Sequence, residues 1–174
     1  MVDRLIVETG TGILKWGSQS TPCAIGKGGA KPDTDKREGD GATPLGTYPL
    51  RWVYYRPDRV APPQTTLPMR GISRQDGWCD DADHPAYNSA VRLPFDASAE
   101  TLWREDGLYD FIVVLGHNDA PARAGLGSAI FLHCCKYDDT GAMKPTLGCV
   151  AVPRETLVTI LRGCTPQTVI EIRE

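Results

Sequence analysis

The sequence lacks several features that would each assign it to a class of protein. No uninterrupted apolar run is long enough for a transmembrane helix, so no membrane partner is expected. The 19 Lys and Arg residues nearly balance the 22 Asp and Glu residues and are scattered, so no nucleic-acid partner is expected either. Residues 1–8 contain no basic segment followed by a long apolar one. We therefore expect a cytoplasmic protein, or a periplasmic one if residues before Met1 have been removed.

The sequence also lacks the cysteine spacing of a structural metal site. It has six cysteines but no Cys-X-X-Cys, and without an export signal we expect reduced thiols, five of them acting as small buried hydrophobes. His133, Cys134, Cys135 and Cys149 are potential zinc ligands. Alternation along a strand would point Cys134 away from His133 and Cys135, so no metal is predicted.

The pattern of short apolar segments predicts one mainly β domain over residues 1–174. At this length a chain buries a core without a disulfide or a metal. Strands outnumber helices, which favours a β-sandwich or barrel with one or two short helices, and a monomer is expected. The expected strands cover residues 5–8, 12–16, 23–25, 47–55, 110–115, 129–135, 149–152 and 168–172, with pieces near 65–72, and the expected helices cover 98–104 and 153–163.

The most informative stretch runs from residue 129 to 152. A short apolar run ends in His133, a polar loop follows, and a second apolar run begins at Cys149. If the loop brings the strand ends together, an imidazole lies beside a thiol, and such an imidazole activates the thiol as a nucleophile. The same residues also fit a second interpretation, in which both are core residues of a sheet.

Two neighbours of Cys149 add to the first interpretation. Gly148 permits unusual backbone torsions and close approach of a substrate, so main-chain N–H groups beside Cys149 could face a developing oxyanion. The hydroxyl of Thr146 could orient either the imidazole or the turn.

Candidate binding residues come from three other segments. Residues 26–46 form a long charged loop, where Arg37, Glu38 and Asp40 are either a solvated turn or a polar wall for a zwitterionic peptide. His117 and Asn118 follow the buried strand 110–115, where polar groups commonly line a cleft. His117 is also a rival to His133 as the base for Cys149, because spacing alone does not decide between them.

Aromatic candidates lie in segment 76–88. Trp78 and Tyr87 stand among acidic and amide groups, and they either contact a ligand or cover the core. The acidic residues of this segment lack the periodicity of an EF-hand, so calcium is not expected.

The order His, polar loop, then Thr146-Leu147-Gly148-Cys149-Val150-Ala151-Val152 resembles the catalytic motif of the L,D-transpeptidase catalytic-domain (YkuD-type) family. Thr43-Pro44-Leu45-Gly46, read as a turn before a strand, and Trp78-Cys79-Asp80-Asp81 with Tyr87-Asn88 resemble a short branch of that family, and the likeness extends over nearly the whole chain. Many members have Gly after the histidine and Arg two positions after the cysteine, where this chain has Cys134 and Ala151.

The resemblance implies an enzyme that acts on peptidoglycan stem tetrapeptides. Cys149 would attack the carbonyl at the L-centre of diaminopimelate and release D-alanine, while His133 would stabilise the thiolate and protonate the leaving amine. The N–H groups of Gly148 and Cys149 would face the oxyanion, and no cofactor or metal is implied. We expect water as the acceptor, which makes an L,D-carboxypeptidase of murein recycling. The alternatives are a transpeptidase with an amine acceptor and a domain that only binds cell-wall peptides.

Overall fold

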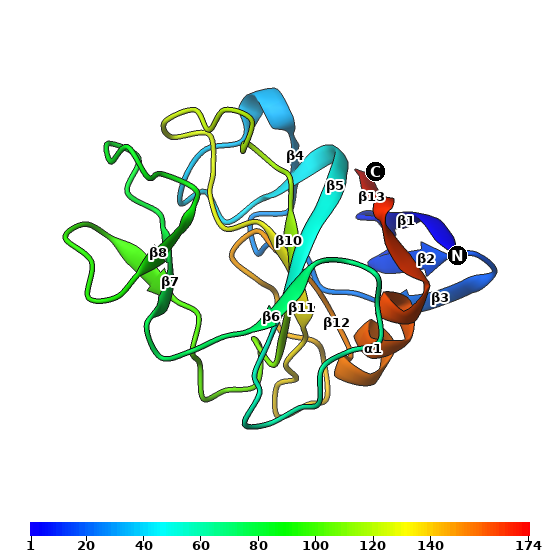
Figure 1. Ribbon diagram of the computed structural model, residues 1–174. Coiled ribbons are helices and arrows are strands. Elements are labelled where there is room, and N and C mark those ends of the chain that lie inside the picture. The colour runs from blue at the N-terminus through cyan, green and yellow to red at the C-terminus, as the bar shows by residue number, and fades with distance from the viewer.

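The computed structural model describes all 174 residues and shows a mainly β fold built on one long, curved sheet (Figure 1). Its strand order is β12-β11-β10-β5-β13-β1-β2-β3, and β4 and β6 also pair with β5. The strands are β1 (Val2–Glu8), β2 (Ile13–Trp16), β3 (Gln19–Pro22), β4 (Ala30–Pro32), β5 (Thr43–Tyr55), β6 (Met69–Gly71), β10 (Phe111–Leu115), β11 (Phe131–Cys134), β12 (Val150–Val152) and β13 (Cys164–Arg173). The expected fold class is confirmed.

The two ends of this sheet meet, which makes it nearly a closed barrel. Ala24 follows β3 at one end, and Ala151 lies in β12 at the other. Their backbones exchange hydrogen bonds of 2.8 and 2.9 Å in an antiparallel bridge. The expected strand 23–25 is therefore only this bridge and its neighbours. The closure covers the edge of β12, the strand that follows Cys149.

The barrel interior is filled by a cluster of 23 buried apolar residues. The only α-helix, α1 (Arg154–Gly163), contributes Leu157, Ile160 and Leu161, which share one face and are 0% exposed. It begins directly after Pro153, as predicted from the proline at its start. No helix has the length and apolar character that a membrane crossing requires.

A second, smaller sheet lies against the outer face of the barrel and is made of β7 (Asp76–Cys79), β8 (Ala90–Arg92) and β9 (Ala99–Thr101) in the order β8-β7-β9 (Figure 1). A second apolar cluster of nine buried residues includes Trp78 of β7, Phe131 of β11 and Cys149. Cys149 therefore lies between the barrel and the small sheet.

Two sequence expectations about local structure were wrong. Residues 98–104 form no helix, because β9 pairs with β7 in the register Trp78↔Glu100. A helix this short would gain few hydrogen bonds relative to the conformational entropy lost in forming its first turn. Thr43-Pro44-Leu45-Gly46 is not a separate turn but the start of β5, where Thr43 to Leu45 pair in parallel with β4. The 3₁₀ turn η1 (Asp33–Asp35) precedes it.

Candidate active site

The register of two parallel strands places His133 and Cys149 on one face of the sheet. β11 and β12 pair with Leu132 opposite Val150 and His133 opposite Ala151. Cys149 immediately precedes β12 and so lies beside Phe131, whose backbone N–H lies 3.4 Å from its Sγ. Because paired residues of parallel strands share a face and side chains alternate, His133 and Cys149 point to the same side. Cys134 points to the opposite side, into the barrel core.

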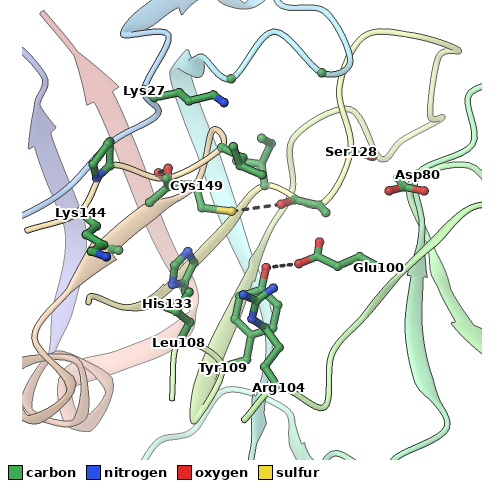
Figure 2. A pocket seen from close by; sticks show the side chains of 18 of the residues that line it. Lys27, Asp80, Glu100, Arg104, Leu108, Tyr109, Ser128, His133, Lys144 and Cys149 are labelled. Carbon is green, nitrogen blue, oxygen red and sulfur yellow. Dashed lines mark hydrogen bonds between the residues drawn. The ribbon is translucent and has the colours of Figure 1, made fainter. Parts of the chain in front are cut away.

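Both side chains line a cavity of about 600 Å³ (Figure 2). Cys149, His133 and Ala151 line it together with Thr146 and Leu147. Leu147 is 75% exposed although it is apolar. The cavity is of the size that small-molecule and peptide sites commonly have.

The thiol of Cys149 is protonated in this resting arrangement. Its side chain is buried, and burial raises its pKa to about 12, with the negative charge of Glu100 acting in the same direction. The thiol donates a hydrogen bond to the main-chain oxygen of Ala129, 3.2 Å away, as the dashed line in Figure 2 shows. The predicted nucleophile is thus a neutral thiol in the resting protein.

His133 is held as a neutral imidazole with one nitrogen available. The ring is 4% exposed, and burial lowers its pKa to about 4. Nδ1 lies 2.8 Å from the carbonyl oxygen of Cys134, which accepts a hydrogen bond only from a protonated Nδ1. Nε2 therefore carries the lone pair. The edge of the Tyr109 ring packs against the imidazole at a centroid distance of 5.3 Å.

A thiol of raised pKa and an imidazole of lowered pKa in one cavity are not a preformed ion pair. The proton must leave sulfur as the substrate is attacked, so His133 can act as a general base in that step and not as the partner of a resting thiolate.

Thr146 fixes the turn before Cys149. Its Oγ1 donates to the carbonyl oxygen of Cys149 at 2.6 Å and accepts from the N–H of Gly148 at 3.1 Å. Of the two alternatives for this hydroxyl, orientation of the turn is the one observed. The N–H of Gly148 is therefore already occupied, whereas that of Cys149 has no acceptor within the protein and stays available for an oxyanion.

The sequence matches a protein-family model over almost its whole length. The model is described as the L,D-transpeptidase catalytic domain, YkuD, and it matches residues 3–172. The chain belongs to this family.

Solved structures similar to this YkuD domain are L,D-transpeptidases of low sequence identity. One from Mycobacterium tuberculosis H37Rv is 10% identical, covers 99% of this chain and 57% of its own, and has a TM-score of 0.47. One from Mycobacterium smegmatis is 11% identical, covers 99% and 59%, and has a TM-score of 0.44. The YkuD domain described here thus spans less than two thirds of those chains. A comparison with curated protein sequences gave no match.

Five of the six predicted binding residues of this YkuD domain do not line the cavity, and three of the five lie in loops. His117 is 2% exposed and packs edge-on against Tyr48, with its Nε2 2.9 Å from the carboxylate of Asp33. Asn118 closes its own loop through hydrogen bonds with Arg123 and Gly127. Arg37 donates to the carbonyl oxygens of Thr34 and Lys36 in its local turn. Of the two imidazoles considered as bases, only His133 shares the cavity with Cys149.

Trp78 and Tyr87 do not line the cavity, but each forms a hydrogen bond to a residue that does or to one that supports it. The Trp78 indole donates to Oδ1 of Asn88 and packs edge-on against Phe131 at 5.2 Å. The Tyr87 hydroxyl bonds the carboxylate of Glu38, and of the predicted binding residues Glu38 alone lines the cavity. Substrate contact by Glu38 stays a prediction.

Asn88 is a supporting residue to which the sequence analysis gave no role. Its Oδ1 accepts from the N–H of Ala129 at 3.0 Å, and its Nδ2 donates to the carbonyl oxygens of His117 and Asn118 at 3.0 and 2.7 Å. It therefore holds Ala129, at φ +53°, with its carbonyl oxygen toward the Cys149 thiol. The only sequence signal was its place after Tyr87 in the Tyr-Asn pair.

Seven charged residues that were not predicted as binding residues also line the cavity. They are Lys27, Lys36, Asp80, Glu100, Arg104, Lys136 and Lys144. Lys36 is 2% exposed and is held by Asp40 at 2.7 Å. No group of three or more His, Cys, Asp or Glu side chains is arranged to hold a metal ion.

Proposed function

We propose that this protein is a cysteine acyl-transferase that acts on peptidoglycan stem tetrapeptides and cleaves the bond between diaminopimelate and the terminal D-alanine. The observation that carries the proposal is the arrangement of Cys149 and His133 on one face of β11 and β12, in a single cavity of about 600 Å³. Family membership supports the class of substrate.

In the first half of the reaction the thiol is converted to a thioester. Nε2 of His133 takes the proton as Sγ of Cys149 bonds to the carbonyl carbon, and the oxyanion lies toward the free N–H of Cys149. The C–N bond then breaks, and the same imidazole gives its proton to the departing amine of D-alanine. This order begins with a neutral base and a neutral thiol. Burial produces both states, because it lowers the pKa of His133 and raises that of Cys149.

In the second half an acceptor releases the acyl group. His133 removes a proton from the acceptor, the acceptor bonds to the carbonyl carbon, and the C–S bond breaks with return of the proton to sulfur. With water the product is a tripeptide, and with an amine it is a cross-linked or exchanged peptide. Water as the acceptor and a cytoplasmic location stay our predictions.

Cations suited to a peptide carboxylate lie on one side of the cavity. Lys27 and Lys144 are seen there in Figure 2, and neither has a carboxylate within 4 Å. Ala151 stands where many members of the family carry arginine, and it offers no charge. We assign the terminal carboxylate of the tetrapeptide to these lysines.

Mass spectrometry of the intact protein tests the proposal. A disaccharide tetrapeptide should add an acyl group to Cys149 and release D-alanine. Cys149→Ala should form no adduct and release nothing. Cys135→Ala removes a thiol that is not among the cavity-lining residues and should behave as wild type.

Repeating the incubation with D-amino acids identifies the acceptor. Predominant tripeptide supports hydrolysis, and predominant exchanged or cross-linked product supports transpeptidation. D-Alanine release by Cys149→Ala would refute the nucleophile. Tetrapeptide binding by wild type without any adduct would favour the binding-domain alternative.

A further inference from the structure

The cavity carries opposite charges on its two sides. Lys27 and Lys144 lie on one side, and Asp80 and Glu100 lie on the other with Ser128, while Cys149 is between them (Figure 2). Glu38 lines the same cavity, and its charge, like that of Asp80, acts on the Glu100 carboxyl. We call Glu38, Asp80 and Glu100 the acidic side.

The acidic side has no ion pair, although Arg104 lines the same cavity and its charge acts on Glu100. None of the three carboxylates has a Lys, Arg or His nitrogen within 4 Å, and two of them, Asp80 and Glu100, are partly buried, where most carboxylates of this protein do have such a partner. Asp40 has Lys36 at 2.7 Å, Asp76 has Arg70 at 2.7 Å, and Asp110 has Arg154 at 3.2 Å. Burial raises the pKa of Glu100, the Tyr109 hydroxyl and the charge of Arg104 lower it, and the charges of Asp80 and Glu38 raise it again. Carboxylates that lie together without a paired cation repel one another, and a bound cation would relieve this.

Two polar atoms beside these charges have no hydrogen-bond partner. Ser128 is 8% exposed and lines the cavity, and its buried Oγ lies near the Tyr87 hydroxyl without forming a hydrogen bond of acceptable geometry. Oδ1 of Asp80 is likewise buried and unpartnered. Buried polar atoms almost always form hydrogen bonds in folded proteins. Two such atoms without a hydrogen bond on the same side of a cavity therefore indicate that a ligand supplies the missing partners.

We propose that Glu38, Asp80, Glu100 and Ser128 form a binding site for a primary ammonium group of the substrate, a proposal that rests on the proposed function. An ammonium has three N–H donors and one positive charge, and it matches a wall of carboxylate and hydroxyl oxygens. A metal ion fits less well, because no cluster of three close ligand side chains exists.

In a stem peptide the ammonium belongs to a diamino acid, and it has two possible sources. It is either the side-chain amine of the acyl donor or the amine of an acceptor. The acidic side is linked to the catalytic base, because Glu100 bonds the Tyr109 hydroxyl and the Tyr109 ring packs on His133. An ammonium held there occupies the same cavity as Cys149 and His133.

The test compares a tetrapeptide that has a free side-chain amine with the same peptide N-acetylated at that amine. If the donor supplies the ammonium, kcat/KM for D-alanine release by wild type should be at least about tenfold higher for the free amine, since a charged hydrogen bond contributes that much or more. In Asp80→Asn and Glu100→Gln the ratio should fall toward one. Asp3→Asn removes the same charge from an exposed position on β1 and should keep the wild-type ratio.

Single-turnover measurements separate the two sources. If the donor supplies the ammonium, acetylation slows thioester formation in the absence of any amine acceptor. If the acceptor supplies it, thioester formation is equal for both peptides, and Asp80→Asn instead lowers the fraction of amine-transfer product. Equal rates and equal product fractions for both peptides in wild type, or an unchanged preference in both variants, would overturn the proposal.

Failure of this inference is distinguishable from failure of the proposed function. A thioester on Cys149 with either peptide upholds the function whatever the preference. If no thioester forms, calorimetry with Cys149→Ala and the two peptides still measures whether the free amine binds about tenfold tighter. That calorimetric comparison also decides the matter if the carboxylate variants do not fold.

Discussion

The Cys149 thiol donates its hydrogen bond to the carbonyl oxygen of Ala129, 3.2 Å away, so its proton points toward a main-chain acceptor in the resting protein. The acceptor is set in place by Asn88, which binds the Ala129 N–H. The thiol must turn from this oxygen before Nε2 of His133 can take the proton. The resting site is therefore protected from side reactions of a free thiolate.

This arrangement predicts how Cys149 alkylation depends on pH. With a thiol pKa of about 12, the thiolate fraction rises tenfold for each pH unit across the neutral and alkaline range. The rate of iodoacetamide labelling of Cys149, measured by peptide mass spectrometry, should therefore rise about tenfold per unit from pH 7 to pH 10. A rate that is constant below pH 8 would reveal a thiolate–imidazolium pair and contradict the neutral resting state. Slow labelling at pH 7 does not by itself exclude an enzyme.

Gly148→Ala should destabilise the protein by about 3 kcal/mol. Gly148 has φ +138°, a conformation that side chains rarely adopt, and an added Cβ would lie 2.9 Å from the Ala42 carbonyl oxygen. Gly141→Ala is the matched control, because Gly141 has φ +83° and nothing within 4 Å of an added Cβ. It should lose only about 1 kcal/mol. Urea unfolding measures both, and equal losses would show that contact with Ala42 is unimportant.

Thr146→Val should weaken both the fold and the reaction. Valine keeps the shape but removes the hydroxyl that bonds the Cys149 carbonyl oxygen and the Gly148 N–H. We expect a loss of about 2 kcal/mol of unfolding free energy and about tenfold slower thioester formation. Thr146→Ser keeps the hydroxyl and should restore most of both. If serine and valine behave alike, the hydroxyl does not fix the turn.

The sequence predicted that His133 and Cys149 share a cavity because both residues stand at short apolar strands, where the period of two fixes the face of each side chain. His133 and Cys134 point to opposite sides as the alternation required. What the pattern did not contain was the parallel pairing of β11 with β12, since strand direction is set by the path of the connecting residues and not by the strands.

The sequence failed where side-chain direction depends on loops. His117 follows a buried strand, which is a common position for a residue that lines a cleft. Its ring instead packs against Tyr48 and lies beside Asp33. Glu100 was assigned to a helix, so its place beside the cavity could not be predicted. Its strand exists only because β7 pairs with it, which is a tertiary effect that a short polar segment does not reveal.

Burial of His133 also predicts how stability depends on pH. Its pKa is lowered from 6.5 in the unfolded chain to about 4 in the folded one, so between these values only the unfolded chain binds the proton. The contribution to stability is complete above about pH 6.5 and is lost as pH falls to 4, a difference of about 3 kcal/mol. His133→Gln cannot be protonated, so between pH 7 and pH 4 wild type should lose about 3 kcal/mol more than this variant in urea unfolding. His117 is also buried and has a lowered pKa, but it is present in both proteins and cancels in the comparison. An equal loss in both would mean that the imidazole takes up its proton in the folded protein near pH 6.5, and would remove the argument that the base is held neutral by burial.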